Sequence, residues 1–151
     1  MLSANVRRFW QDFCYRHNMP ADTPAHTWSF STDPAAATDK AELVRRGIKT
    51  ASTALVDMYD QDNASIPHVG EYNIVMNGMG EPVCVVQLQV VEVIPFGQIS
   101  EEHAYHEGEG DRSYDYWREV HSSLFSDQLD KINKGLTDAT PCVSMVFSVI
   151  K

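Results

Sequence analysis

One stretch of the sequence places a cation and several hydroxyl groups directly after a predicted helix end. Residues 45–54 read Arg-Arg-Gly-Ile-Lys-Thr-Ala-Ser-Thr-Ala, with Gly47 where a helix C-terminus takes a left-handed residue. Arg45 and Arg46 would complement the dipole of the last helical turn, so the helix end alone explains them. Lys49 has no such explanation. A lysine followed closely by hydroxyls is suited to binding an anionic or carbonyl group.

A second stretch, residues 101–112, gathers five acids, two histidines and one arginine around two glycines. Glycines allow a backbone to approach a ligand closely, and crowded carboxylates raise one another's pKa, which suits a general acid. A solvated helix and loop would have the same composition. His103, His106 and Glu107 have a spacing that a metal could use, but no HExxH or paired-cysteine pattern accompanies them, so we expect no metal site.

Several classes of protein are excluded by what the sequence lacks. There is no G-x-S-x-G elbow, no Walker A loop and no G-x-G-x-x-G after a strand, which argues against nucleoside triphosphate chemistry. The net charge of −9, from 12 Lys+Arg against 21 Asp+Glu, argues against a broad surface that follows phosphates. A small ligand fits this charge balance better than a long nucleic acid.

The length and composition predict one globular domain. The 151 residues are 43% hydrophobic and 10% aromatic, and no apolar run is long enough to span a bilayer. The first residues lack the apolar region of a signal peptide, so we expect a cytoplasmic protein. The three cysteines, Cys14, Cys84 and Cys142, are far apart among apolar neighbours and are interpreted as reduced core residues.

Helical and strand patterns alternate along the chain. An apolar stripe from Val6 to His17 predicts a first helix, Asp33-Pro34 opens a second that ends at Gly47, and Asn77-Gly78 predicts a hairpin. The remaining predictions are strands at 27–31, 72–76, 83–94 and 143–149, a strand after Gly47, a short helix from Ser100, a helix over 113–126, and loops at 57–67 and 130–140. Together they predict an α+β domain whose short, twisted strands suit a small barrel.

Several blocks, in this order, resemble the ASCH domain of the PUA-like superfamily. They are Gly-Ile-Lys-Thr-Ala-Ser (47–52), Val-Gly-Glu-Tyr (69–72), the strand 83–93, Pro95-Phe96, Glu-Gly-Glu-Gly-Asp-Arg-Ser (107–113), Tyr-Trp-Arg (116–118) and His121. The resemblance runs from about Trp28 to Ile150. It implies a small PUA-like β-barrel flanked by helices, as one domain over residues 1–151 with an N-terminal helical extension over about 1–24. It also implies that RNA or a modified nucleoside binds in a cleft between barrel and helix.

Some ASCH proteins are amidohydrolases that remove the acetyl group of N4-acetylcytidine with a Lys, Thr and Glu set. By motif, this set falls on Lys49, Ser52 and Glu107. Serine replaces their threonine at Ser52, and Ala54 stands where the shorter amidohydrolases carry arginine; both changes bear on the substrate. Lys49 and Ser52 would face opposite sides of a regular strand, so a shared site requires a bulge or bend.

Three functions follow from these residues. In the first, which we favour, a desolvated Lys49 on a barrel strand accepts a proton from Ser52 or water, and Glu107 protonates the departing amine. The second is a metal-stimulated ribonuclease acting on single-stranded RNA, with acids holding a divalent ion; no other cofactor is expected. The third is a non-catalytic reader of RNA or a nucleotide, which requires a basic face around Arg45, Arg46, Lys49 and Arg112. The expected ligand-binding residues are Arg45, Thr50, Glu109, Arg112, Trp117 and His121, although for Trp117 core packing is favoured over base stacking.

Overall fold

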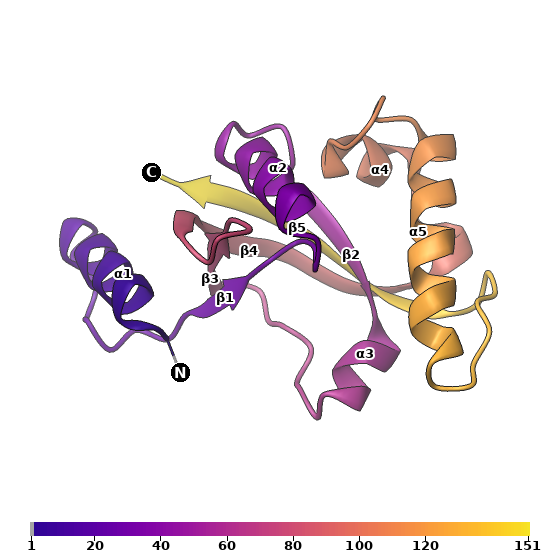
Figure 1. Ribbon diagram of the computed structural model, residues 1–151, viewed down its shortest axis with the longest axis horizontal. Coiled ribbons are helices and arrows are strands. Elements are labelled where there is room, and N and C mark those ends of the chain that lie inside the picture. Colours follow the sequence, from indigo (N-terminus) through magenta and orange to yellow (C-terminus); the bar gives the residue numbers. More distant parts are fainter. Residues whose placement is uncertain (1) are drawn as a thin grey trace.

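The computed structural model describes residues 2–151 and has a curled, five-stranded half-barrel sheet surrounded by five α-helices (Figure 1). The strand order is β1-β3-β4-β5-β2, with β1 parallel to β3 and the other neighbours antiparallel. The strands are β1 (His26–Trp28), β2 (Ala51–Leu55), β3 (Tyr72–Met76), β4 (Pro82–Pro95) and β5 (Pro141–Ile150). The helices are α1 (Ala4–Arg16), α2 (Pro34–Arg45), α3 (Val56–Gln61), α4 (Glu101–Glu107) and α5 (Tyr114–Asp130). The predicted α+β class with a small barrel-like sheet is confirmed.

The predicted hairpin forms between β3 and β4. The Asn77 side-chain oxygen accepts hydrogen bonds from the backbone N–H groups of Met79 at 2.9 Å and Glu81 at 3.0 Å, which fixes the turn. β4 then continues past β3 to pair along β5, with a register shift between Leu88 and Val90. Such an irregularity bends a strand, and it contributes to the curl of the sheet.

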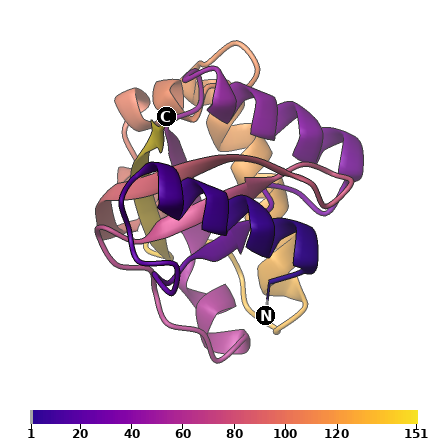
Figure 2. The same ribbon diagram turned by 90° about the vertical axis from the view of Figure 1, so that its left-hand side faces the viewer.

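Three groups of apolar side chains join the helices to the sheet. α1 lies across one face of the strands (Figure 2) and buries Trp10 and Phe13 beside Ile74. α2 packs Ala41 and Val44 against the strands near Val86. α5 buries Trp117, Phe125 and Leu129 near Phe96. Phe96 begins a 3₁₀ turn (Phe96–Gln98) that follows β4. All three cysteines are buried and free, as the sequence predicts.

Two segments differ from the prediction. The polar stretch expected as a loop begins with α3, because Met58 and Tyr59 pack on two apolar clusters and Asp57 pairs with Lys134 at 2.6 Å. Tertiary contacts therefore stabilise a helix too short to form by itself. Similarly, α5 runs on to Asp130, because Leu129 is buried. No helix within residues 2–151 is long and apolar enough to cross a membrane.

Candidate functional site

The segment that carries Lys49 is fixed by the end of α2. Gly47 takes the left-handed conformation with φ +75°, and the N–H groups of Ile48 and Lys49 both donate to the carbonyl of Leu43, at 2.9 and 3.1 Å. The chain then turns into β2, which begins at Ala51. Lys49 therefore precedes the strand and does not lie on it. Its side chain is only 1% exposed, so it is not a surface lysine.

The end of α4 is attached to the same segment. The Thr50 N–H donates to the carbonyl of His106 at 2.8 Å, which places the last turn of α4 beside Lys49. Gly108 then ends the helix with φ +74°, and a Cβ at this position would lie 2.7 Å from the Ile48 carbonyl oxygen. Only glycine fits there without displacing backbone. This close contact brings Glu107, which is 2% exposed, against Lys49.

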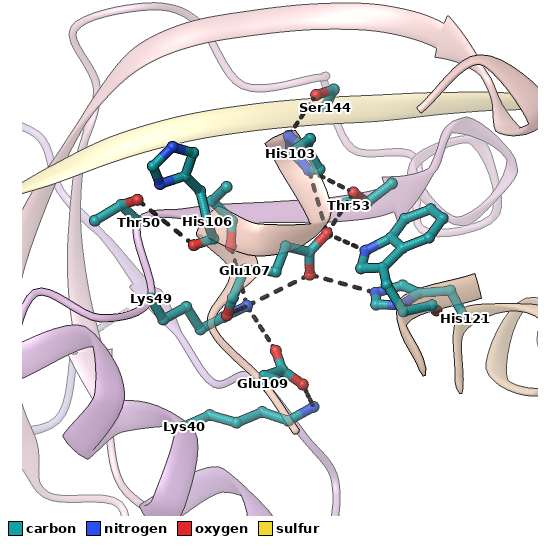
Figure 3. Close-up of polar contacts among 12 residues, drawn as sticks. Lys40, Lys49, Thr50, Thr53, His103, His106, Glu107, Glu109, His121 and Ser144 are labelled. Atoms are coloured by element: carbon teal, nitrogen blue, oxygen red, sulfur yellow. Dashed lines mark hydrogen bonds and ion pairs between the residues drawn. The ribbon is translucent and has the colours of Figure 1, made fainter. Parts of the chain in front are cut away.

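One oxygen of the Glu107 carboxylate is held by three side chains from three elements (Figure 3). The Thr53 hydroxyl of β2 donates to Oε2 at 2.7 Å, and the indole N–H of Trp117 on α5 donates at 2.7 Å. His103 Nε2, one turn earlier on α4, lies 3.2 Å from the same oxygen and 2.8 Å from the Thr53 hydroxyl. Thr53 therefore lies between a carboxylate and an imidazole.

The other carboxylate oxygen faces two basic groups. Lys49 Nζ lies 3.5 Å from Glu107 Oε1, and His121 Nε2 lies 3.4 Å from it. His121 Nδ1 lies 2.9 Å from the Trp117 carbonyl, which can only accept, so this nitrogen carries a proton. We call Lys49, Thr53, His103, Glu107, Trp117 and His121 the Glu107 cluster.

Glu109 continues the ion pairs toward the surface. Lys49 Nζ lies 2.7 Å from Glu109 Oε2, and Lys40 on α2 lies 3.3 Å from Glu109 Oε1 (Figure 3). The Lys49 ammonium also donates to the Ala51 carbonyl at 3.0 Å. The buried ammonium thus has two acidic partners, and one of them is Glu109, an expected ligand-binding residue.

The surroundings of Glu107 keep it ionised. Burial alone would raise the pKa of this carboxyl, but the hydrogen bonds from His103 and His121, together with the charges of Lys49 and His121, outweigh burial and hold the pKa well below its usual range. The expectation that crowded acids raise its pKa is wrong for Glu107, because its closest neighbours are donors and cations. At rest it is therefore a carboxylate, not a general acid.

The hydroxyl in the cluster is Thr53 and not Ser52. Alternate residues of β2 are buried, and Thr53 lies opposite Ser144 of β5, whose hydroxyl is 3.2 Å from His103 Nδ1. Ser52 lies on the face of the strand opposite to Thr53, and its side chain makes no hydrogen bond within residues 2–151. No bulge brings it round. Side chains of a strand alternate between its two faces, so counting from a known start at Ala51 would have placed Thr53 on the buried face.

A cavity of about 390 Å³ opens beside the cluster; we call it the His103 cavity. His103 and Ser144 form part of its wall, and Thr50, Glu92, Glu102 and His106 add further polar groups. Of the expected ligand-binding residues, Thr50 is the one that lines this cavity. Thr53 is not part of this wall, but its hydroxyl lies 2.8 Å from Nε2 of His103, which is part of it.

Two of the expected ligand-binding cations lie elsewhere. Arg45 pairs with Glu42 on an exposed face of α2. The Arg112 guanidinium lies 3.7 Å from the centre of the Tyr105 ring and donates to the Tyr105 carbonyl at 3.0 Å. Since Lys49 is buried, Arg45, Arg46, Lys49 and Arg112 do not form a common basic face.

His103 and His106 do not combine into a metal site. His103 faces Thr53 and Ser144, whereas His106 Nε2 lies 3.9 Å from Glu102 on the outer side of α4. In the part of the chain that the structure describes, from residue 2 onward, no group of three His, Cys, Asp or Glu side chains is arranged to hold a metal ion.

The half-barrel sheet and its helices define a PUA-like domain. A family model for the ASCH domain matches residues 26–151, so the chain belongs to the ASCH domain family. It is similar to the ASCH domain from Lactobacillus crispatus JV V101, with 29% identity and a TM-score of 0.84 over 95% of this chain and 94% of that one. It is also similar to protein EF3133 from Enterococcus faecalis V583, of family model DUF984, with 28% identity and a TM-score of 0.86 over 97% and 88%. A comparison with curated proteins finds no match.

Proposed function

We propose that this ASCH protein is a hydrolase that removes an acyl group from an N4-acylated cytidine-like nucleoside. The observation that carries the proposal is the position of the Thr53 hydroxyl, 2.7 Å from the ionised Glu107 and 2.8 Å from His103 Nε2. A hydroxyl with a base within hydrogen-bond reach, and a third group that orients the pair, is the usual arrangement of an activated nucleophile. Thr53 replaces Ser52 as the proposed nucleophile.

The hydrogen-bond partners determine where the Thr53 proton lies. An ionised carboxylate only accepts, so Thr53 donates its single proton to Glu107, and His103 Nε2 carries a proton toward the Thr53 oxygen. His103 Nδ1 then accepts from the Ser144 hydroxyl. This set of donors and acceptors fixes the rotamer of Thr53 and the tautomer of His103 before a substrate arrives.

Glu107 moves the proton in both directions. As the Thr53 oxygen attacks the acyl carbon, the Thr53 proton passes to Glu107. The C–N bond then breaks, and Glu107 transfers that proton to the departing amine. The donors and cations around Glu107 lower its pKa, so they favour return of the protonated form to the carboxylate once the amine is in place. Water then cleaves the acyl–threonine ester, its proton returns through Glu107 to Thr53, and the carboxylic acid leaves. Lys49 supports the carboxylate form before and after each step.

The His103 cavity favours an uncharged nucleoside over a phosphate-bearing strand. Its volume of about 390 Å³ is in the range of small-molecule sites. Its wall includes the acids Glu92 and Glu102 and, among the described residues, no lysine or arginine. Phosphates bind most strongly where lysine or arginine faces them, and an RNA backbone meets neither among the described residues of this wall.

The proposal is tested by incubating the purified protein with N4-acetylcytidine and measuring cytidine by liquid chromatography. We expect release by the unchanged protein, and loss of release in Glu107→Gln and Lys49→Ala. Glu101→Gln, an exposed acid at the start of α4, is the control and retains activity. Absence of release at high enzyme concentration contradicts the proposal. Cleavage of single-stranded RNA by the same preparation would favour a ribonuclease instead.

A further inference from the structure

A larger cavity lies on the other face of the sheet. Met145 and Leu88 line it, whereas Ser144 and Val146, the neighbours of Met145 on β5, line the His103 cavity. Neighbouring residues of a strand point to opposite faces, so the two cavities lie on opposite sides of the sheet. Its volume is about 500 Å³. Its wall is completed by residues of β1 and α3, by the segment between α3 and β3, and by Asn73 of β3. We call it the Asn73 cavity.

Four polar side chains at this cavity have no hydrogen-bond partner within residues 2–151. The residues Trp28, Tyr59, Glu71 and Asn73 line it, and none of their side chains makes a hydrogen bond or ion pair with another residue in 2–151. Asn73 is only 8% exposed. No fully buried side-chain N or O atom within residues 2–151 lacks a partner, so the unpartnered Asn73 amide is accessible from the cavity and available to a ligand there.

The aromatic wall is fixed in position. The Trp28 ring packs 4.6 Å from Phe30 and 5.3 Å from Phe147, measured between ring centres, so its place does not depend on a ligand. Tyr59 lies near Glu71: burial, and then the charge of Glu71, raise the pKa of Tyr59. Leu88 and Met145 supply an apolar floor. The cavity therefore combines two aromatic side chains with one carboxylate.

The charge at the cavity selects the class of ligand. Among the described lining residues, Glu71 is the acidic one, and none is a lysine or an arginine. With His26 neutral, the cavity wall therefore carries one negative charge. Aromatic rings attract cations through their π-faces, and a carboxylate with an amide oxygen accepts from ammonium N–H groups. We propose that the Asn73 cavity binds a small organic cation, an amine with an apolar or aromatic body, whose N–H groups donate to Glu71 and Asn73.

The test uses three probes of matched shape and different charge. At neutral pH 2-phenylethylamine is a cation, 3-phenylpropionate is an anion and 2-phenylethanol is uncharged. Binding is followed by the indole N–H signals in ¹⁵N-edited NMR spectra, with Trp28→Phe to assign the Trp28 signal. The other two indoles are engaged in hydrogen bonds, Trp10 to the Thr23 carbonyl and Trp117 to Glu107. They report whether the fold is intact.

We expect 2-phenylethylamine to shift the Trp28 signal in a saturable manner and to leave the signals of Trp10 and Trp117 in place. Glu71→Gln removes the charge from this hydrogen bond, so it weakens binding about tenfold or more. Glu119→Gln, an exposed acid on α5, removes the same charge elsewhere and leaves binding unchanged. A Trp28 signal that does not move at millimolar amine overturns the proposal. Equal binding of the anion, or unchanged binding by Glu71→Gln, overturns it as well.

Discussion

The two faces of the sheet treat buried polar groups in opposite ways. Around Glu107, a carboxylate, an ammonium, two imidazoles, an indole and a hydroxyl satisfy one another at 2.7 to 3.5 Å. Around Asn73, four polar side chains line a larger cavity with no partner among the described residues. In the first arrangement the polar groups fix one another in position, and in the second the donors and acceptors face an open cavity. Removing a polar group should therefore have opposite consequences on the two faces.

The largest effect is expected from removing the carboxylate of Glu107. Glu107→Gln leaves Lys49 with Glu109 as its remaining acidic partner and disturbs four other hydrogen-bonding side chains. Breaking a buried ion pair by removing one member costs about 3 kcal/mol or more in the free energy of unfolding. Urea unfolding measures this loss. Glu102→Gln, with an exposed side chain on the same helix, is the control and should change stability by less than about 0.5 kcal/mol. Equal values for the two variants would mean that the cluster does not stabilise the fold.

The same carboxylate predicts how stability depends on pH. Because folding lowers the pKa of Glu107, its contribution is fully present above the ordinary glutamate pKa of about 4.3 and is lost as pH falls below that value toward the folded pKa. Unfolding midpoints measured from pH 7 downward should therefore fall for the unchanged protein. They should fall less steeply for Glu107→Gln. Parallel curves for the two proteins would contradict the lowered pKa.

The smallest effect, and one of opposite sign, is expected at Asn73. Its amide makes no hydrogen bond that Asn73→Leu would break, so we expect the free energy of unfolding to stay the same or to rise by up to about 1 kcal/mol. Asn77→Ala is the matched control, because the Asn77 oxygen accepts two backbone N–H groups in the hairpin turn. This control should lose about 1 kcal/mol. A comparable loss for Asn73→Leu would show that its amide has a structural partner.

The parts of the fold that depend on local signals are predictable from the sequence. Asp33 caps α2 by accepting from the Ala36 N–H at 3.1 Å, and Ser100 caps α4 by accepting from the His103 N–H at 3.0 Å. The Asn-Gly turn also lies where the pattern predicts it. By contrast, α3 depends on contacts with distant segments, and its own residues read as a polar loop.

The candidate site is predictable only in part, for a comparable reason. Lys49 and Glu107 follow from the resemblance to ASCH proteins, and the structure places them together. The choice between Ser52 and Thr53 depends on where β2 begins, and the pairing of β2 with the distant strand β5 sets that start. The Trp117 and His121 side chains reach Glu107 from a separate helix, so helical spacing alone predicts a packed face and not hydrogen bonds.

The most direct test of the account compares the two neighbouring hydroxyls of β2. Thr53→Val keeps the shape of the side chain and removes the proposed nucleophile, whereas Ser52→Ala removes a hydroxyl from the opposite face of the same strand. The measurement is kcat/KM for cytidine release from N4-acetylcytidine, with the indole NMR signals as a check of folding. The account predicts no detectable release by Thr53→Val and nearly unchanged kcat/KM for Ser52→Ala. Activity retained by folded Thr53→Val, or lost in Ser52→Ala, would contradict it.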